Sequence, residues 1–237
     1  MKEQSSKYRF EEAATMATEE TSLGYSSYWR RKQLLAKGAP EANLLRWWPS
    51  EDLCEVERLY LEAISDAASV LDVGAGDTTT MQKLKAAGYR GTYHTMDVGE
   101  EYSYTYRDLD QVKSEYAAIL FLDVLEHLSL HDGLTMLKRL VSFLEPGGVM
   151  VVQTANARCI RFPLSWDMTH LHCYNSMDLW AYLTSLGLDV TVYRVAFRRP
   201  GRSILDVIRD TVNAWITTRV LGCDYADNIV CVGRKPR

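Results

Sequence analysis

The sequence lacks the features that mark several large classes of protein. It has no long basic stripe and a formal net charge of −4, so nucleic-acid binding is not expected. No apolar run is long enough to cross a bilayer, and residues 1–6 lack the apolar core of a signal peptide. The five cysteines are scattered and follow no metal-type spacing, a pattern typical of a reducing compartment. We therefore expect a cytoplasmic protein.

Two common phosphate-binding motifs are also missing. Residues 69–77, Ser-Val-Leu-Asp-Val-Gly-Ala-Gly-Asp, form a short apolar run that passes through an acid into a glycine turn. A dinucleotide-binding turn needs a third glycine where this chain has Thr79. A phosphate loop needs Gly-Lys followed by Ser or Thr, and none is present. The acid, Asp72, would repel phosphate but suits a ligand that carries an ammonium group.

What is present is the end of a buried strand joined to a tight turn. Gly74 and Gly76 permit that turn and leave no side chain between the backbone and a ligand. Asp97 ends the next apolar stretch, residues 91–96, where its carboxylate would meet ribose hydroxyls. We predict a nucleoside-binding site at the carboxyl ends of two parallel strands. An ordinary strand-to-helix connection is the alternative interpretation of the glycine turn alone.

Three later segments favour the nucleoside site. Residues 106–109, Tyr-Arg-Asp-Leu, would place Asp108 near an adenine amino group. Residues 116–127 indicate a buried strand followed by a polar turn. Residues 144–152 indicate a helix end, a Pro-Gly-Gly turn and a fifth strand.

Taken together, these segments resemble the class I S-adenosylmethionine-dependent methyltransferases over roughly residues 66 to 195. The resemblance is carried by Asp72-x-Gly74-x-Gly76 and by the strings Asp-Val-Leu-Glu-His-Leu and Leu-Glu-Pro-Gly-Gly, with Thr78 where that family often has a third glycine. It implies S-adenosylmethionine as cofactor. The cofactor-binding residues that it implies are Asp72, Gly74, Ala75, Gly76, Asp97, Val98, Asp108, Leu109, Leu122 and Asp123.

The alternation of strands and helices predicts an α/β fold, a doubly wound and mostly parallel seven-stranded sheet. Residues 1–65 are expected to form a helical cap or lid, and residues 66–237 the cofactor-binding domain. The expected strands are 69–73, 92–96, 104–107, 117–122, 148–154, 188–197 and 228–233. The expected helices lie near 78–87, 131–144 and 176–186.

A helical insertion is expected at about 202–222, between the last two strands. Its apolar residues follow helical spacing, and they are Ile204, Leu205, Ile208, Val212, Trp215, Ile216 and Val220. Packing against the domain or a second subunit, as in a homodimer, is the favoured interpretation. The alternative is an interfacial membrane helix, but the polar face has no lysine and its charges balance.

The catalytic candidates follow the fifth strand, within residues 162–174. Methyl transfer is an in-line displacement, and a weakly acidic hydroxyl acceptor needs a base. The pattern Asp-x-Thr-His-x-His-x-Tyr is similar to a segment of bacterial methyltransferases of glycan, lipopolysaccharide and secondary-metabolite pathways, which in many relatives have Pro where this chain has Met168. We predict His170 as the base, oriented by Asp167, with His172 as a second candidate and His127 facing the cofactor side.

Other roles for these histidines remain open. Each imidazole could instead hold the loop through hydrogen bonds. A metal site formed by Asp167, His170 and His172 is chemically possible, but the sequence shows no clear further ligand and we predict none.

Several aromatic residues near the N-terminus have two possible roles. Tyr25, Tyr28, Trp29, Trp47 and Trp48 would either pack the cap onto the sheet or close over a sulfonium cofactor through cation–π contact.

The sequence thus favours O-methylation of a sugar hydroxyl, in a glycan or a glycosylated metabolite, with a histidine base. An N- or C-methyltransferase of a small metabolite is the alternative. A nicotinamide-dependent oxidoreductase or epimerase is more distant, because no Tyr-x-x-x-Lys pair follows the fourth strand. An inactive scaffold is disfavoured by the intact acids at Asp72, Asp97 and Asp108.

Overall fold

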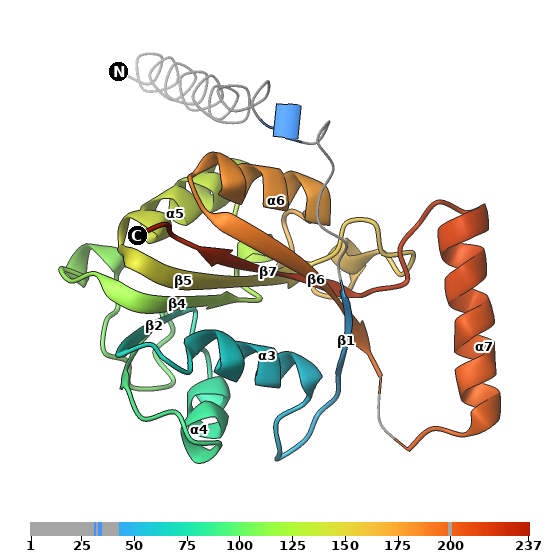
Figure 1. Ribbon diagram of the computed structural model, residues 1–237, viewed down its shortest axis with the longest axis horizontal. Helices are drawn as coiled ribbons and strands as arrows, with labels where there is room; N and C mark the ends of the chain where they lie inside the picture. Colours follow the sequence, from blue (N-terminus) through green and yellow to red (C-terminus); the bar gives the residue numbers. More distant parts are fainter. Residues whose placement is uncertain (1–30, 32, 35–42, 199–200) are drawn as a thin grey trace, which may run out of the picture.

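Seven strands form one central sheet in this protein (Figure 1). The computed structural model describes residues 31, 33–34, 43–198 and 201–237. The strands are β1 (Asn43–Trp47), β2 (Ser69–Val73), β3 (Thr92–Met96), β4 (Tyr116–Leu122), β5 (Leu144–Ala155), β6 (Asp189–Phe197) and β7 (Asn228–Arg234).

The strand order is β1-β6-β7-β5-β4-β2-β3, and β7 alone runs antiparallel to its neighbours, β5 and β6. The other pairs are parallel. The chain therefore reverses its lateral direction between β2 and β4, the kind of switch point where open α/β sheets bind ligands. This confirms the predicted doubly wound, mostly parallel seven-stranded sheet.

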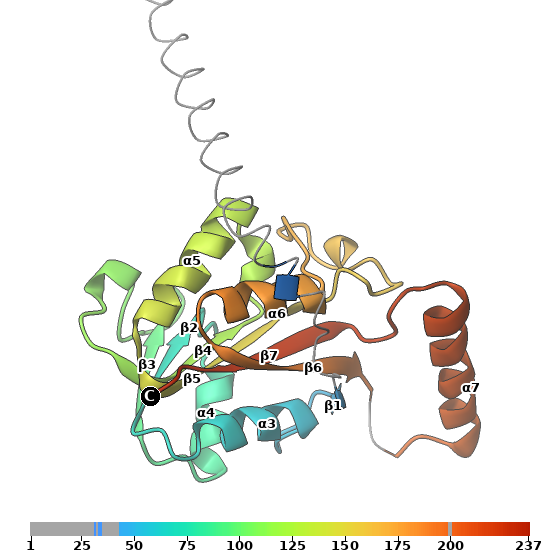
Figure 2. The ribbon, with the colours of Figure 1, turned by 45° about the horizontal axis from the view of Figure 1, so that its top comes forward.

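Helices cover both faces of the sheet. On one face lie α3 (Glu55–Ile64) and α4 (Thr79–Ala86), and on the other lie α5 (Leu130–Ser142) and α6 (Ser176–Ser185) (Figure 2). Each layer encloses its own hydrophobic cluster. One cluster is centred on Leu137, Leu140 and Phe121, and the other on Tyr60, Ile64 and Leu84. Because side chains on a strand alternate between faces, β4 contributes to both clusters.

Polar side chains define where the covering helices begin. Ser129 accepts a hydrogen bond from the backbone of Asp132 at the start of α5, and Asn175 accepts one from Asp178 at the start of α6. At α3 the Glu57 carboxylate accepts from the backbone N–H of Cys54 at 2.8 Å. Such caps satisfy amide groups that have no partner within the helix.

One predicted strand is absent from the sheet, and one strand of the sheet was not predicted. Residues 104–107 form no strand; Tyr106 makes only an isolated bridge to Met96, because Thr95 and Thr105 exchange side-chain-to-backbone hydrogen bonds there. The seventh strand is instead Asn43–Trp47, within the region 1–65 that was predicted to be a helical cap, and it pairs with β6. Its Leu44 and Arg46 are exposed while Leu45 and Trp47 are half-buried, the alternation of an edge strand.

The predicted insertion forms α7 (Ile204–Trp215), which continues as a π-helical turn at Ile216–Val220. Ser203 caps it by accepting from the backbone of Asp206. Figure 1 shows α7 standing to one side of the sheet, beyond β1 and β6. Packing on a second subunit, one of the two expectations, stays a prediction. Packing on its own domain is not seen among the described residues, because the large apolar side chains of α7 are exposed. These are Ile204, Leu205, Val207, Ile208, Val212, Trp215, Ile216 and Val220.

Ion pairs attach α7 to the chain that leads into it. The buried carboxylate of Asp210 pairs with Arg198, at 3.6 Å, and with Arg202. These contacts are polar, so they leave the apolar face of the helix uncovered. Among the described residues, no helix is both long and apolar enough to cross a membrane.

Candidate active site

The glycine turn after β2 is held tightly against β3. The backbone N–H groups of Gly74 and Ala75 both donate to the Met96 carbonyl, at 2.8 and 3.2 Å. Gly74 has φ +78°, and a β-carbon there would lie 2.1 Å from a methyl group of Val124. The position thus requires glycine for its backbone angle and for the close approach of the β4 end.

Asp97 joins this turn to the end of β3. Its carboxylate accepts hydrogen bonds from the backbone N–H groups of Gly76, at 2.9 Å, and Gly99, at 2.8 Å. The Tyr104 hydroxyl donates to the Gly76 carbonyl at 2.7 Å. The structure therefore brings the predicted residues Gly74, Ala75, Gly76 and Asp97 together in one turn.

The other residues predicted around the nucleoside lie in the segment that follows β3 and Asp97. Val98 is exposed. Asp108 is exposed and caps a short 3-10 turn (Leu109–Gln111), accepting from the backbone of Asp110 at 2.7 Å, while Leu109 is buried. The exposed side chains of Val98 and Asp108 thus lie at the surface of this segment, outside the residues joined in the glycine turn.

Thr78 explains how the chain dispenses with a third glycine. It stands immediately before α4 with φ +62°, in the left-handed region that glycine adopts most readily. The side chain tolerates this angle while accepting a hydrogen bond from the Gln82 amide at 3.1 Å.

A small cavity of about 120 Å³ opens where β2, β4 and β5 end. It contains five of the predicted cofactor residues, Asp72, Gly74, Ala75, Leu122 and Asp123, beside Trp47, Glu57, Tyr60, Thr80 and Gln153. Among the residues that the structure describes, three carboxylates line it and no Lys or Arg does. Glu57 pairs with Lys83 at 2.6 Å, but none of the described ion pairs includes Asp72 or Asp123. This lining fits a ligand with positive charge.

Asp72 is buried and has one hydrogen-bond donor, the Tyr93 hydroxyl at 2.7 Å. Burial, reinforced by the negative charge of Asp97, raises the pKa of Asp72 to about 6, although the Tyr93 hydrogen bond lowers it. A buried carboxylate without a cation is costly. Such groups concentrate at functional sites.

Asp123 adopts an unusual backbone conformation at the end of β4, with φ +53°. Solvent reaches the residue, and its carboxylate accepts hydrogen bonds from Gln153, at 2.6 Å, and from Asn228, at 2.9 Å. Desolvation by the surrounding protein is the main cause that raises the pKa of Asp123 to about 7, and the negative charge of Glu126 is the second. A strained backbone angle in a non-glycine residue often marks a functional site.

The catalytic candidates lie just beyond Asp123. A 3-10 turn (Leu125–His127) carries His127, and its Glu126 carbonyl accepts from the backbone N–H groups of Leu171, at 2.8 Å, and His172, at 3.1 Å. These bonds bring the loop after β5 against the turn after β4. The rings of His127 and His170 then lie edge to face with centroids 4.9 Å apart.

Hydrogen bonds at Nδ1 define the tautomers of both rings. His170 Nδ1 lies 2.9 Å from the Pro163 carbonyl, which can only accept, so Nδ1 carries the proton. His127 Nδ1 lies 2.9 Å from the Thr169 hydroxyl, which donates its only proton to Asp167 at 2.6 Å. His127 Nδ1 must therefore donate to Thr169. In the neutral rings this leaves each Nε2 with a free lone pair.

The contacts in this cluster bear on the roles predicted for Asp167 and His172. The Pro163 carbonyl, rather than Asp167, orients the His170 ring; Asp167 acts on His127 through Thr169, whose hydrogen bond also lowers the pKa of Asp167. His172 faces a different cavity of about 280 Å³ and packs on Tyr174 with ring centroids 4.8 Å apart. Burial lowers the pKa of His172.

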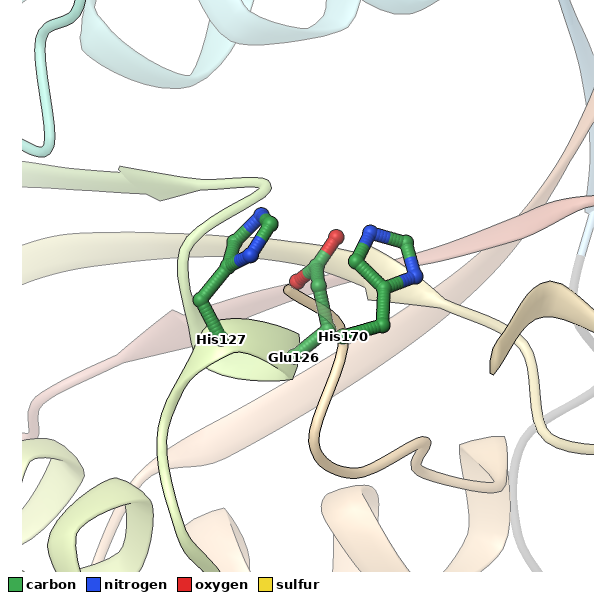
Figure 3. Close-up of side chains that lie close together, drawn as sticks. All are labelled: Glu126, His127 and His170. Atoms are coloured by element: carbon green, nitrogen blue, oxygen red, sulfur yellow. The ribbon is translucent and has the colours of Figure 1, made fainter. Parts of the chain in front are cut away.

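The sequence interpretation did not single out Glu126, which lies between the two histidines in Figure 3. Glu126 is 3% exposed, and its carboxylate accepts from the Thr154 hydroxyl at 2.7 Å. Thr169 and Gln153 were also missed, since their roles depend on contacts across the sheet. The signal for Glu126 was its place beside His127, in the turn that follows β4 and Asp123.

Comparison with known proteins agrees with this geometry. A family model described as a methyltransferase domain matches residues 41–193, more than half of the chain. No curated protein matches the sequence.

Solved structures share the fold at low sequence identity. A SAM-dependent methyltransferase from Archaeoglobus fulgidus is 17% identical, with a TM-score of 0.59 over 76% of this chain and 93% of that one. An O-methyltransferase family protein from Burkholderia thailandensis is 12% identical, with a TM-score of 0.52 over 77% of this chain and 57% of that one. The magnesium protoporphyrin IX methyltransferase from Synechocystis, solved with bound SAM, is 15% identical. Its TM-score is 0.50 over 76% of this chain and 78% of that one.

The matched region spans β1 to β6 and includes the glycine turn, Asp97, the acidic cavity and the histidine pair. The chain belongs to the methyltransferase domain family and is a class I S-adenosylmethionine-dependent methyltransferase.

Proposed function

We propose that this enzyme methylates a hydroxyl group of a sugar, in a glycan or a glycosylated metabolite. The observation that carries the proposal is the pair His127 and His170. Both rings have Nδ1 engaged as a donor and Nε2 left as an acceptor, next to the acidic cavity at the ends of β2 and β4. A neutral amine attacks through its own lone pair and needs no such group, whereas an aliphatic hydroxyl must lose its proton as it attacks.

The cofactor would be held by residues already joined in the glycine turn. Asp97 presents a carboxylate suited to ribose hydroxyls, and Gly74 and Ala75 let the backbone approach closely. Asp72 and Asp123 supply negative charge for a ligand with an ammonium and a sulfonium group. When bound, S-adenosylmethionine supplies a methyl group activated by the positive sulfur.

The histidine pair would take the proton of the acceptor. The hydroxyl O–H bond would break as its proton moves to a free Nε2. The oxygen would form its new bond to the methyl carbon while the carbon–sulfur bond of the cofactor breaks and the electron pair of that bond leaves with sulfur. Asp167 stabilises the resulting imidazolium of His127 through the Thr169 hydroxyl. A positioned acid or base of this kind contributes about 10²- to 10⁴-fold to a rate.

A row of aromatic rings favours a sugar as acceptor. Trp47 lines the acidic cavity and packs on Phe197, with centroids 5.0 Å apart, and Phe197 packs on Trp166 at 5.9 Å. Phe197 and Trp166 are partly exposed, at 39% and 38%. The C–H face of a pyranose ring can lie against such rings while its hydroxyl groups face polar side chains.

Isotope transfer tests this proposal. The enzyme is incubated with methyl-labelled S-adenosylmethionine and separate panels of oligosaccharides, nucleotide sugars and small amines, and products are identified by mass spectrometry. We expect methyl ethers on sugars. Transfer confined to nitrogen or carbon atoms would overturn the hydroxyl assignment.

Variants then test the histidines on the acceptor found. His170→Ala and His127→Ala should lower kcat at least about 100-fold with little change in the affinity for S-adenosylhomocysteine. His172→Ala is the matched control, because its ring lines the other cavity. Unchanged turnover in both His127→Ala and His170→Ala would end the base assignment.

A further inference from the structure

We propose that Glu126, His127 and His170 form a binding site for a divalent transition-metal ion, which positions the hydroxyl oxygen of the acceptor. The task assigned to the ion rests on the proposed function, while the site itself rests on the geometry of these three side chains. They come from the turn after β4 and the loop after β5, and Figure 3 shows the Glu126 carboxylate between the two imidazole rings.

The spacing of the ligand atoms suits one shared ion. Each residue offers one atom, and the three atoms lie within 4.8 Å of one another. Two atoms bound at about 2.1 Å to the same ion are at most about 4.2 Å apart. The set therefore needs only small rotations of the side chains to close on a cation.

Glu126 is a buried carboxylate without a cation of its own. It is 3% exposed, and its one side-chain hydrogen bond from a described residue comes from Thr154. None of the ion pairs among the described residues includes it. Buried charges in proteins are paired or coordinate metals, and here the neighbouring imidazoles are the groups that would share the metal.

The histidines carry the outer hydrogen bonds expected of metal ligands. A ligating imidazole usually donates its second N–H to a carbonyl or a carboxylate, which fixes the ring and its tautomer. His170 donates from Nδ1 to the Pro163 carbonyl at 2.9 Å. His127 donates from Nδ1 to Thr169, which is bonded to the Asp167 carboxylate. Both rings thus present Nε2 for coordination.

The donor set indicates the kind of ion. Two imidazole nitrogens and one carboxylate suit Zn²⁺, Co²⁺, Fe²⁺ or Ni²⁺ better than Mg²⁺ or Ca²⁺, which prefer oxygen ligands. Three protein ligands leave coordination positions open, as in catalytic sites. Hydroxyl oxygens of a sugar can occupy those positions.

With the ion bound, the task of the cluster changes from accepting a proton to acidifying the hydroxyl. The oxygen of the acceptor coordinates the ion, its O–H bond breaks, the electron pair stays on oxygen and the proton passes to water. Coordination lowers the pKa of a bound O–H group strongly. The imidazole nitrogens then serve as ligands rather than as bases.

Titration of the EDTA-treated protein, residues 1–237, with Co²⁺, followed by the visible absorption of the bound Co²⁺, tests the site. We expect one equivalent of Co²⁺ per chain, displaced by Zn²⁺. Affinity should fall at least 100-fold in Glu126→Gln and in His170→Ala, and about 10-fold in Thr169→Val, which removes an outer hydrogen bond. His172→Ala should bind Co²⁺ like the wild type.

Binding of S-adenosylhomocysteine checks that each variant is folded, because none of the three ligands lines the acidic cavity. If Glu126→Gln does not fold, His170→Ala carries the test. Equal Co²⁺ binding by the wild type and the ligand variants, or binding well below one equivalent, would overturn the metal site.

Activity separates this inference from the proposed function. Sugar methylation that stops in EDTA and returns with Zn²⁺ or Co²⁺ supports the metal site and the sugar acceptor, with the histidines as ligands in place of bases. Sugar methylation that continues in EDTA overturns the task of the ion and leaves the proposed function standing. Stoichiometric Co²⁺ binding by an enzyme that methylates only amines supports the site and overturns the hydroxyl acceptor.

Discussion

The imidazole rings of His127 and His170 meet edge to face, with centroids 4.9 Å apart and an angle of 73° between their planes. They come from two loops that follow neighbouring parallel strands, β4 and β5. The Glu126 carbonyl holds the loops together by accepting two backbone N–H groups. The pair is therefore fixed by the backbone before any ligand binds, which is the arrangement that catalytic groups require.

Thr169 positions His127, so its hydroxyl should matter although it touches no reacting atom. Thr169→Val removes the link to Asp167 and should lower kcat about 10-fold while the affinity for S-adenosylhomocysteine stays unchanged. Thr169→Ser keeps the hydroxyl and should restore most of the rate. Steady-state kinetics of both variants check this, and equal losses in Val and Ser would show that only the shape of the side chain matters.

Asp72 should make the stability of the ligand-free protein depend on pH. Its pKa in the folded protein is about 6, above the ordinary 3.8, so the folded state binds the proton more tightly than the unfolded state. The protonated Asp72 therefore stabilises the folded state fully below pH 3.8, and this contribution is lost as the pH rises through 6. At about 1.4 kcal/mol per pKa unit, the charged form costs roughly 3 kcal/mol at neutral pH.

Asp72→Asn should therefore be more stable than the wild type by about 3 kcal/mol at neutral pH, with the difference shrinking toward pH 4. Denaturant unfolding of both proteins across this range measures it, and Asp66→Asn, at an exposed position, is the control. We expect the same Asp72→Asn variant to bind S-adenosylmethionine more weakly. A constant difference across the pH range would show that Asp72 does not titrate in the folded protein.

Gly74→Ala should abolish cofactor binding for two reasons that can be separated. The new methyl group would meet Val124, and the φ of +78° strains any side chain. Gly187 has φ +94° with nothing within 4 Å of a β-carbon, so Gly187→Ala measures the strain alone, about 1 kcal/mol. Calorimetric titration with S-adenosylhomocysteine should show binding lost in Gly74→Ala and kept in Gly187→Ala.

The exposed face of α7 should contribute little to the stability of the domain. Leu205 and Ile208 are 77% and 54% exposed, so Leu205→Ser and Ile208→Ser should change the free energy of unfolding by no more than about 0.5 kcal/mol. Leu137→Ala, at a fully buried position, should cost about 2–5 kcal/mol. A loss of that size in the α7 variants would show that another surface covers the helix in solution.

The sequence predicted the parts of the fold that local patterns determine. The apolar run around Asp72, the helical stretches near 131–144 and 176–186 and the apolar run after Pro-Gly-Gly are all signals within a few residues, and the strands and helices formed at these positions. Residues 43–47 carry too short an alternation to stand out in a helical context. Their pairing with β6 is a long-range contact, so local pattern did not reveal it.

The candidate site follows the same division. Asp72, Gly74, Asp97 and Asp123 each directly follow or end a strand, so their meeting at one edge of the sheet could be predicted. The hydrogen-bond partner of each histidine could not be predicted. His170 contacts the Pro163 carbonyl and His127 contacts the Thr169 hydroxyl. Both contacts depend on how the loop after β5 folds, and the spacing of apolar residues does not predict that conformation.

The place of β7 has a consequence for folding during synthesis. It is the last of the seven strands to be made, yet it lies between β5 and β6. Until it arrives, those two strands present unpaired backbone edges, a condition that favours aggregation. Its first residue, Asn228, also donates to the Asp123 carboxylate. The nascent chain therefore completes its sheet and the hydrogen bonding of Asp123 in the same late step, and an enzyme truncated before β7 would lose both together.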